Sequence, residues 1–491
     1  MGKSRAVIIG GGLGGLSAAV SLASRGWKVT VAEKNSHLGG KLNVCKKDGF
    51  NFDLGPSLLT MPHIFYSLFN RAGKDPKKYF EFKQVNPQWR NFFPDGSQID
   101  LFQQTDSTAK ILNKLYPGSA EQFNKFLNYA NKQRNLIESL YFKRGIDSVW
   151  DLLLKSNPIE VLQVDMYTSV SGSLEKHIKD KHLQQILGYF CKYVGSSPYR
   201  APAFLNALCS IQFAFGAYYI KGGMYKLAEA LGKLLLEQGV DIKTGYEATG
   251  IKTGWGNTIE GVHFRDRETL PCDIVVSNME TIPFYIRVAG LTTHAHALER
   301  RFPPSCSGLV IHLGVNKNYP WLAHHNIFHS QSPKKQFRSV FERFTLPDDP
   351  ILYVVAPDQP GLAPKGCSVI KVLPQIPSLY SKSGVTCEGL KKLRSAVLGK
   401  LQRMGLEDLE NHIVTEKTLS PYDLKSLYNS HRGAIYGTVS DRWKNMGFKA
   451  PQKSTIFSNL YFAGGSVNPG CGMPMVVLGG MQVADRIGFA R

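Results

Sequence analysis

A short glycine-rich segment near the N-terminus constrains the fold more than any other feature. The apolar run at positions 6–9 is typical of a buried strand, and the residues after Gly15 have the apolar spacing of a helix. Between them, Gly10, Gly12 and Gly15 form the pattern G-x-G-x-x-G. Glycines at this spacing let a pyrophosphate approach the backbone, where amide N–H groups at a helix start bind the anion. The segment predicts the first strand, turn and helix of a Rossmann-like α/β domain.

A second strand and a second glycine pair follow this helix. Residues 27–33 are typical of a strand that ends in Glu33, whose carboxylate can accept hydrogen bonds from ribose hydroxyls. Lys34 comes next, and Gly39–Lys41 contains a glycine pair and a basic residue that can wrap the phosphates from the next loop. The glycine pattern alone is a weak signal. Strand, turn, helix, strand and acid in this order predict a dinucleotide site.

Three later segments have features that suit the same site. Gly55 and Pro56 form a tight turn that can lie against a flat ring. Residues 273–278 are an apolar strand with a polar tip at Asn278, where the chain is expected to return to the nucleotide domain. Residues 459–475 repeat the order of strand, glycine turn and helix, so a second helix start can face an anion or an electron-rich ring edge.

The pattern Glu33–Lys41 resembles that of the flavoprotein oxidoreductases of the amine oxidase and carotenoid desaturase superfamily. The likeness extends along nearly the whole chain and includes the Gly222–Gly223 turn and the string Gly464–Pro474. Within the superfamily, the chain is most similar to bacterial and fungal phytoene desaturases. This resemblance implies a GR2 or amine-oxidase-like fold.

The resemblance also implies an activity. FAD would be bound non-covalently, and a long carotenoid would be drawn from a membrane into an apolar tunnel. A hydride would leave an allylic carbon for the flavin, a proton would leave the neighbouring carbon, and a trans double bond would form. Oxygen or a quinone would be the final electron acceptor. Phytoene, a later carotenoid or a hydroxylated carotenoid would serve as substrate.

Two catalytic candidates come from the same resemblance. Asp151 lies where related enzymes have an acidic residue proposed to act near the isoprenoid, although an acid there also suits a helix start. Asn468 stands where the family usually has histidine, and asparagine cannot titrate near neutrality. Ala248 falls near a position that faces the adenine in such flavoproteins.

The residues predicted to hold FAD are the glycine turns, the acid and their flanking positions. They are Gly10, Gly12, Leu13, Gly14, Gly15, Glu33, Lys34, Gly39, Gly40, Lys41, Gly55, Pro56, Ala248, Asn278, Gly464, Gly465, Gly472, Met473, Pro474 and Met475.

The predicted domains are interleaved. The FAD-binding domain is expected to comprise residues 1–105, 211–290 and 451–491. Residues 106–210 are expected to form a helical region for substrate and membrane association. Residues 291–450 are expected to form a substrate-binding domain built on a mixed sheet.

Charge and composition favour a membrane partner. The chain has 59 basic and 38 acidic residues, which gives a formal net charge of +21. Such a chain attracts nucleic acid or an anionic membrane, and no nucleic-acid-binding signature is present. Residues 146–154 and 161–166 combine apolar faces with charges, which suits helices that rest on a bilayer or pack on a core. We expect a cytoplasmic, peripheral membrane protein that does not bind nucleic acid.

Cysteine and histidine spacing predicts neither disulfides nor metal. The 8 cysteines are scattered, which fits a reducing compartment. His324, His325 and His329 are predicted to be structural, because adjacent histidines on a strand point to opposite faces.

Three alternatives to the desaturase remain open. One is a carotenoid isomerase or terminal oxidase on the same scaffold, since fold likeness cannot separate these activities. The second is a flavoenzyme related to amine or protoporphyrinogen oxidases, which would need an aromatic cage or a polar pocket. The third is a prenyl-binding carrier without flavin.

Overall fold

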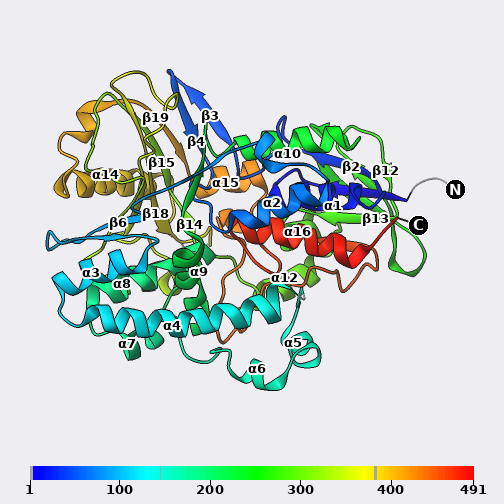
Figure 1. Ribbon diagram of the computed structural model, residues 1–491. Helices are drawn as coiled ribbons and strands as arrows, with labels where there is room; N and C mark the ends of the chain where they lie inside the picture. Colours follow the sequence, from blue (N-terminus) through cyan, green and yellow to red (C-terminus); the bar gives the residue numbers. More distant parts are fainter. Residues whose placement is uncertain (1–3, 144, 381–383, 491) are drawn as a thin grey trace.

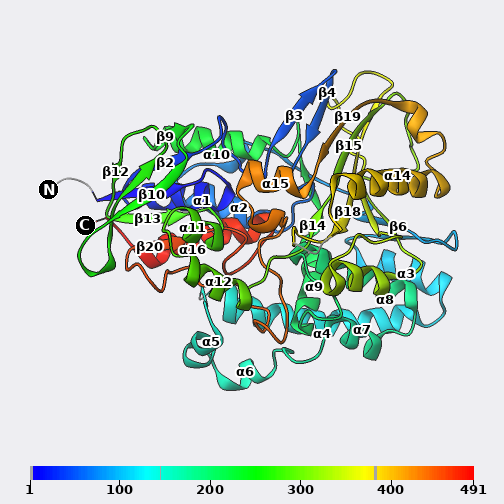
Figure 2. The same ribbon diagram turned by 180° about the vertical axis from the view of Figure 1, so that it is seen from behind.

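A five-stranded parallel sheet brings three distant stretches of the chain together (Figures 1 and 2). Its order is β20-β13-β1-β2-β9. The strands are β1 (Arg5–Ile9), β2 (Lys28–Glu33), β9 (Asp241–Thr244), β13 (Ile274–Ser277) and β20 (Leu460–Phe462). The computed structural model describes residues 4–143, 145–380 and 384–490. Strands β13 and β20 confirm the predicted return of the chain to the first domain.

The alternation of side chains along β1 decides what covers each face of this sheet. Ala6 and Ile8 pack in one cluster with α1 (Leu13–Ala23), α10 (Lys226–Glu237) and α16 (Met473–Ile487). Val7 and Ile9 pack on the opposite face with an antiparallel three-stranded sheet and α11. Figure 2 shows this second face. The elements that cover it are β10 (Ala248–Thr253), β11 (Ile259–Phe264), β12 (Leu270–Pro271) and α11 (Thr281–Arg287).

Helices α1 and α16 lie unusually close together. A Cβ atom added to Gly480 would lie 2.5 Å from the carbonyl oxygen of Gly14 and 2.7 Å from Cβ of Ser17. The hydroxyl of Ser17 also donates to the carbonyl of Val477 across the same contact, at 2.6 Å. This contact fixes the start of α16 beside the first glycine turn.

A mixed eight-stranded sheet forms the second half of the molecule. The order is β19-β15-β18-β17-β16-β6-β7, with β14 paired to β18, and β16 is parallel to β6. Helix α14 (Cys387–Arg403) covers one face. The strands are β6 (Trp89–Phe92), β7 (Gln98–Leu101), β14 (Ser307–Gly308), β15 (Val310–Val315), β16 (His325–Phe328), β17 (Leu352–Val355), β18 (Ser368–Ile376) and β19 (Ile413–Leu419).

A helical layer packs on the other face of the mixed sheet. It contains α3 (Thr105–Leu115), α4 (Ser119–Ile137), α7 (Val170–His177), α8 (Lys181–Tyr189) and α9 (Ala207–Phe215). Helices α5 (Val149–Lys155) and α6 (Pro158–Leu162) stand off the lower edge of this layer in Figures 1 and 2. Within the described ranges, no helix combines the length and apolar character needed to cross a membrane.

Shorter elements connect these layers. They are β3 (Val44–Lys47), β4 (Phe50–Asp53), α2 (Pro62–Arg71), β5 (Phe82–Gln84), β8 (Tyr218–Ile220), α12 (Thr292–Arg301), α13 (Pro333–Arg338) and α15 (Pro421–Tyr428). The domain boundaries remain a proposal.

The contact between α1 and α16 predicts the effect of adding one methyl group. Gly480→Ala should lower the free energy of unfolding by about 1–3 kcal/mol, because the new Cβ meets backbone atoms that cannot move aside. Gly399→Ala, in the interior of α14, is the control. Its nearest neighbour is a side-chain nitrogen of Arg403 at 3.4 Å, so helix propensity should raise stability by about 0.5–1 kcal/mol. Denaturant titration measures both, and a stabilised Gly480→Ala variant would contradict the prediction.

Candidate functional site

Two glycine loops meet at the carboxyl end of the parallel sheet. The amide of Gly39 donates to the carbonyl of Gly11 at 2.8 Å, and a Cβ on Gly40 would lie 3.0 Å from Cα of Gly12. Gly10 has φ of +95° and Gly39 has φ of +113°, a backbone conformation that favours glycine. The second glycine pair therefore lies directly against the first turn, as the sequence predicts.

Asn278 and the C-terminal glycines complete this arrangement. The amide of Asn278 donates to the carbonyl of Ile9 at 2.8 Å, and its side-chain Nδ2 donates to the carbonyl of Ala463 at 2.5 Å. A Cβ on Gly464 would lie 3.0 Å from the same Nδ2. We call Gly10–Gly15, Gly39–Gly40, Asn278 and Gly464–Gly465 the glycine cradle.

Glu33 is buried at one side of the cradle, with 4% of its surface exposed. Its Oε2 accepts from the amide of Gly11 at 2.7 Å, and its Oε1 accepts from the amide of Asn35 at 2.8 Å. The amide of Tyr246 donates to the carbonyl of Glu33 at 2.9 Å, which brings the start of β10, at Ala248, to this side of the cradle. The predicted ribose-binding acid and the adenine-facing position thus lie near each other.

The two lysines that were predicted to hold FAD contact other segments of the protein. Lys34 Nζ donates to the carbonyl of Ser426 in α15 at 2.6 Å, and burial lowers the pKa of Lys34. Lys41 Nζ donates to the carbonyl of Ile435 at 2.8 Å and lies 3.3 Å from Oε1 of Glu280. Both lysines therefore tie the second glycine loop to the C-terminal half of the chain.

The turn at Gly55 and Pro56 is held from the second sheet. A Cβ on Gly55 would overlap the carbonyl oxygen of Lys41, so only glycine fits there. The buried Lys371 of β18 donates to the carbonyls of Asp53 (3.2 Å) and Gly55 and to Oγ of Ser57 (3.0 Å). Burial lowers the pKa of Lys371 to about 8. One lysine thus connects the mixed sheet with this turn, which lies against Lys41.

The residues of the cradle fit a dinucleotide with a flat ring. The N-termini of α1 and α16 bracket it, and Gly472, with φ of +104°, precedes Met473 and Pro474 in the first turn of α16. Backbone amides at a helix start bind anions and favour negative charge on a ring edge. At the cradle glycines the space of the missing Cβ is taken by a neighbouring protein segment, whereas nothing lies within 4 Å of that position at Gly472, which leaves its backbone open to close approach.

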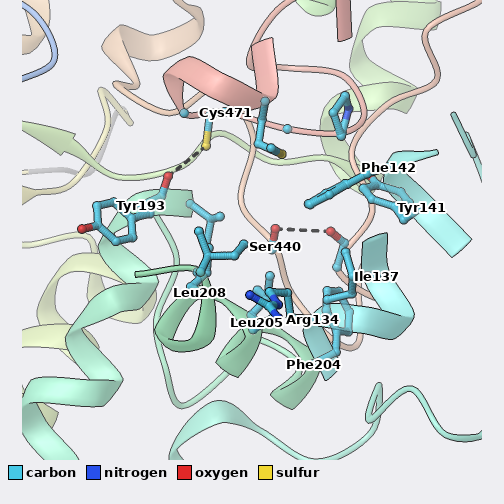
Figure 3. Close-up of a pocket in the computed structure, with 18 of the residues that line it drawn as sticks. Arg134, Ile137, Tyr141, Phe142, Tyr193, Phe204, Leu205, Leu208, Ser440 and Cys471 are labelled. Carbon is cyan, nitrogen blue, oxygen red and sulfur yellow. Dashed lines mark hydrogen bonds between the residues drawn. The ribbon is translucent and has the colours of Figure 1, made fainter. Parts of the chain in front are cut away.

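An apolar chamber that is partly open to solvent lies beside the start of α16, next to the cradle. It extends from Leu152 of α5 and Met166 to the segment Cys471–Met475. Figure 3 shows Tyr193 and Cys471 on one side and Ile137, Tyr141 and Phe142 on the other. The polar side chains in its wall include Thr60, Arg134, Gln212, Ser440 and Lys449. Such a chamber suits a long apolar molecule.

The catalytic candidates have full sets of local contacts. Asn468 is buried; its Oδ1 accepts from Tyr141 Oη and from the amide of Lys449 (2.9 Å), and its Nδ2 donates to the carbonyl of Asp147 (3.2 Å). Asp151 lies in the first turn of α5, where its Oδ2 accepts from the amide of Asp147 at 3.1 Å. These contacts are structural, and the catalytic roles of both residues remain predictions.

Sequence reasoning missed the buried bases around the site. Burial lowers the pKa of Lys449 to about 8 and that of His312 to about 3. His312 lies beside Lys371, and its Nε2 is 3.1 Å from the carbonyl of Asp53. No linear pattern marks these residues, because their partners are distant in the sequence. Within the described ranges, no group of three or more His, Cys, Asp or Glu side chains is arranged to hold a metal ion.

Comparison with known proteins identifies the family. The model for flavin containing amine oxidoreductases matches residues 13–336. The chain belongs to this family. It is an FAD-dependent oxidoreductase, as the sequence predicts, and a carrier without flavin is therefore excluded. The binding of FAD by the individual residues of the cradle remains a proposal that rests on the fit described above.

Two curated relatives match the chain over nearly its whole length. A 4,4'-diapolycopene oxygenase of Methylomonas sp is 50% identical over 490 residues, which are 99% of this chain and 98% of the relative. A 4,4'-diaponeurosporene oxygenase of Staphylococcus haemolyticus is 44% identical over 491 residues, with 99% and 97% covered. Both are named as oxygenases rather than as phytoene desaturases.

Solved structures share the fold at lower identity. An oxidoreductase from Methanosarcina mazei has a TM-score of 0.65 at 18% identity, with 98% of this chain and 100% of that chain covered. A putrescine oxidase bound to putrescine has a TM-score of 0.65 at 14% identity, with 99% and 98% covered. These likenesses support the fold alone.

The position of Glu33 predicts its effect on cofactor content. Glu33→Ala should lower the FAD-to-protein ratio at least tenfold, because it removes a buried carboxylate beside Gly11 that can bind a ribose. Flavin absorbance after gel filtration measures the ratio. Glu229→Ala, on the exposed surface of α10, is the control and should retain its flavin. Stoichiometric FAD in Glu33→Ala would show that the proposed orientation of the dinucleotide is wrong.

Proposed function

We propose that this protein is an FAD-dependent carotenoid oxygenase that oxidises the end of a long linear polyene. The observation that carries the proposal is the apolar chamber, which extends from Leu152 of the exposed helix α5 to the start of α16. A polyene can lie in such a chamber with one end beside the start of α16. A charged or strongly polar substrate would lose its hydration there without compensation.

The two relatives support oxygenation over desaturation. Their names state an action on 4,4'-diapolycopene and on 4,4'-diaponeurosporene, and their identity to this chain extends over the chamber as well as the cradle. We therefore place the terminal oxidase, which the sequence left as an alternative, before the phytoene desaturase. Desaturation stays in the proposal as a second outcome, because in both reactions a hydride would leave the polyene for bound FAD. In the oxygenation, water would then add to the polyene cation and lose a proton, and oxygen would take up the two electrons that the flavin had accepted.

The chain contributes binding, orientation and exclusion of water. FAD, when bound, supplies a two-electron acceptor. The apolar wall strips water from the polyene, and residues 471–475 hold its end next to the start of α16. Tyr141 and Asn468 tie the helical layer to that segment, so the chamber keeps its shape during turnover.

Product mass tests the function. Purified protein with FAD would be mixed with liposomes that contain 4,4'-diaponeurosporene, 4,4'-diapolycopene, phytoene or neurosporene. We expect flavin bleaching without air, and products with added oxygen in air, from the first two substrates. Products that have lost two hydrogens without gaining oxygen would identify a desaturase. If none of the four polyenes bleaches the flavin, the result would contradict both the oxygenase and the desaturase. Glu33→Ala, with little flavin, is the negative control.

We also propose that α5 and α6 dock the protein on a membrane surface. One side of this pair packs inward through a cluster that includes Leu152, Val161 and Met166. The other side leaves large apolar residues in solvent, since Leu154 is 83% exposed and Leu162 is 85% exposed. The helices therefore combine packing on the core with an exposed apolar face beside the chamber, and the net charge of +21 favours anionic lipid.

Liposome flotation tests the docking surface. A triple variant with the substitutions Trp150→Ser, Leu154→Ser and Leu162→Ser should bind phosphatidylglycerol vesicles at least about tenfold less than the wild type. The reason is that each apolar side chain contributes about 1.5–3 kcal/mol when buried. Trp255→Ser removes a side chain that is 95% exposed outside α5 and α6 and should leave binding unchanged. Equal flotation of the triple variant and the wild type would contradict this role for the helices.

A further inference from the structure

Arg134 places a positive charge in the wall of the apolar chamber. It lies in the last turn of α4, it lines the chamber, and its side chain is 19% exposed. Figure 3 shows it beside Leu205, on the side of the chamber opposite Cys471, which lies next to the start of α16. A molecule that extends across the chamber can therefore contact both Arg134 and the start of α16.

The guanidinium of Arg134 has few acceptors within the protein. Its Nη2 donates to Oδ1 of Asn135 at 3.4 Å, and its Nε is buried without a hydrogen-bond partner among the described residues. Oε1 of Glu138 is 3.8 Å from this Nε, which is beyond hydrogen-bond distance. The guanidinium also lies over the ring of Phe215, 5.4 Å from its centroid, which helps to hold it in place. Arg134 thus keeps N–H donors that no described residue uses.

Other polar side chains in the chamber wall differ from Arg134 in this respect. Gln212, Ser440 and Lys449 each make a hydrogen bond to a neighbouring part of the protein, and Figure 3 shows the one made by Ser440. Ligand pockets are mostly apolar, with a few polar groups that fix the orientation of the ligand. An arginine with unused donors in a largely apolar wall has the properties of such a group.

We propose that Arg134 binds a carbonyl or carboxylate oxygen on the part of the polyene that lies away from the start of α16. Arginine N–H groups donate to both kinds of oxygen, and the bond to a carboxylate is charge-assisted. A hydrocarbon offers no acceptor there, so Arg134 favours polyenes that already carry oxygen at one end. The unoxidised end then lies beside α16.

This assignment defines the place of the substrate in a reaction sequence. An earlier oxidation of the first end, in a previous turnover or by another oxidising enzyme, must supply a polyene that Arg134 can recognise. The protein would then oxidise the second end in preference to the first. The proposal rests on the proposed function, because that function places the reacting end beside α16.

Substitution of Arg134 tests this specificity. Arg134→Met removes the charge and the donors but keeps an unbranched side chain, and Arg134→Lys keeps the charge. Lys125→Met is the control, because Lys125 lies on the same helix, pairs with Glu121 and is 70% exposed. Each protein would receive 4,4'-diapolycopene or the same polyene with one end oxidised to an aldehyde or a carboxylic acid. The shift in polyene absorbance gives the dissociation constant, and bleaching of the flavin gives the rate.

We expect Arg134→Met to raise the dissociation constants of the two oxidised polyenes about tenfold and to leave that of the hydrocarbon within about twofold of the wild type. A lost charge-assisted hydrogen bond is sufficient for this factor. Arg134→Lys should lose about threefold, since it keeps the charge but not the planar array of donors. Lys125→Met should match the wild type with all three polyenes.

Two results would overturn the proposal. One is unchanged dissociation constants for the oxidised polyenes in both Arg134 variants, and the other is an equal loss for all three polyenes. A failure of the proposed function gives a different result. In that case the wild type would bind the oxidised polyenes through Arg134, but none of the three polyenes would bleach its flavin.

Discussion

Direct backbone contacts at glycine positions hold the glycine cradle together. Gly14 and Gly480 bring α1 against α16, and Gly12 and Gly40 bring the two N-terminal loops into contact. A single Cβ at any of these contacts would push the backbone segments apart, and the helix starts would no longer face one site. The contacts also reach the second half of the molecule. The loop that follows Gly40 leads to the turn held by Lys371, so the mixed sheet is positioned by the same arrangement.

The buried lysines around the site differ in the partners of their amino groups. Lys371 has three oxygen partners and holds the Gly55 turn against the mixed sheet. Lys449 lines the chamber and donates to the carbonyl of Thr438. Lys192 has aromatic faces in place of acceptors. Proteins bury unpaired polar groups rarely, and those that persist in a well-packed core are concentrated at functional sites. This contrast separates a lysine with three oxygen partners from one whose Nζ has no hydrogen-bond partner among the described residues.

The chamber explains why helices α5 and α6 have apolar residues on two sides. Their inner residues, such as Leu152, help to form the chamber wall, whereas Leu154 and Leu162 face solvent. A helix that only closed a core would expose polar residues instead. An apolar substrate has little solubility in water, so the proposed docking of these helices on lipid would shorten its path to the chamber.

The sequence by itself determined the cradle, because each of its parts is a local pattern with a backbone reason. Gly10–Gly15, Glu33 and Asn278 could be predicted from strand ends and glycine spacing, and the structure brings them together. The chamber and the aromatic surroundings of Lys192 were decided only by the tertiary structure. Trp89, Lys192 and Tyr353 come from three distant segments, and no periodicity marks them. Burial and partner geometry are properties of packing between distant segments, whereas conformational freedom at glycine is a property of the residue itself.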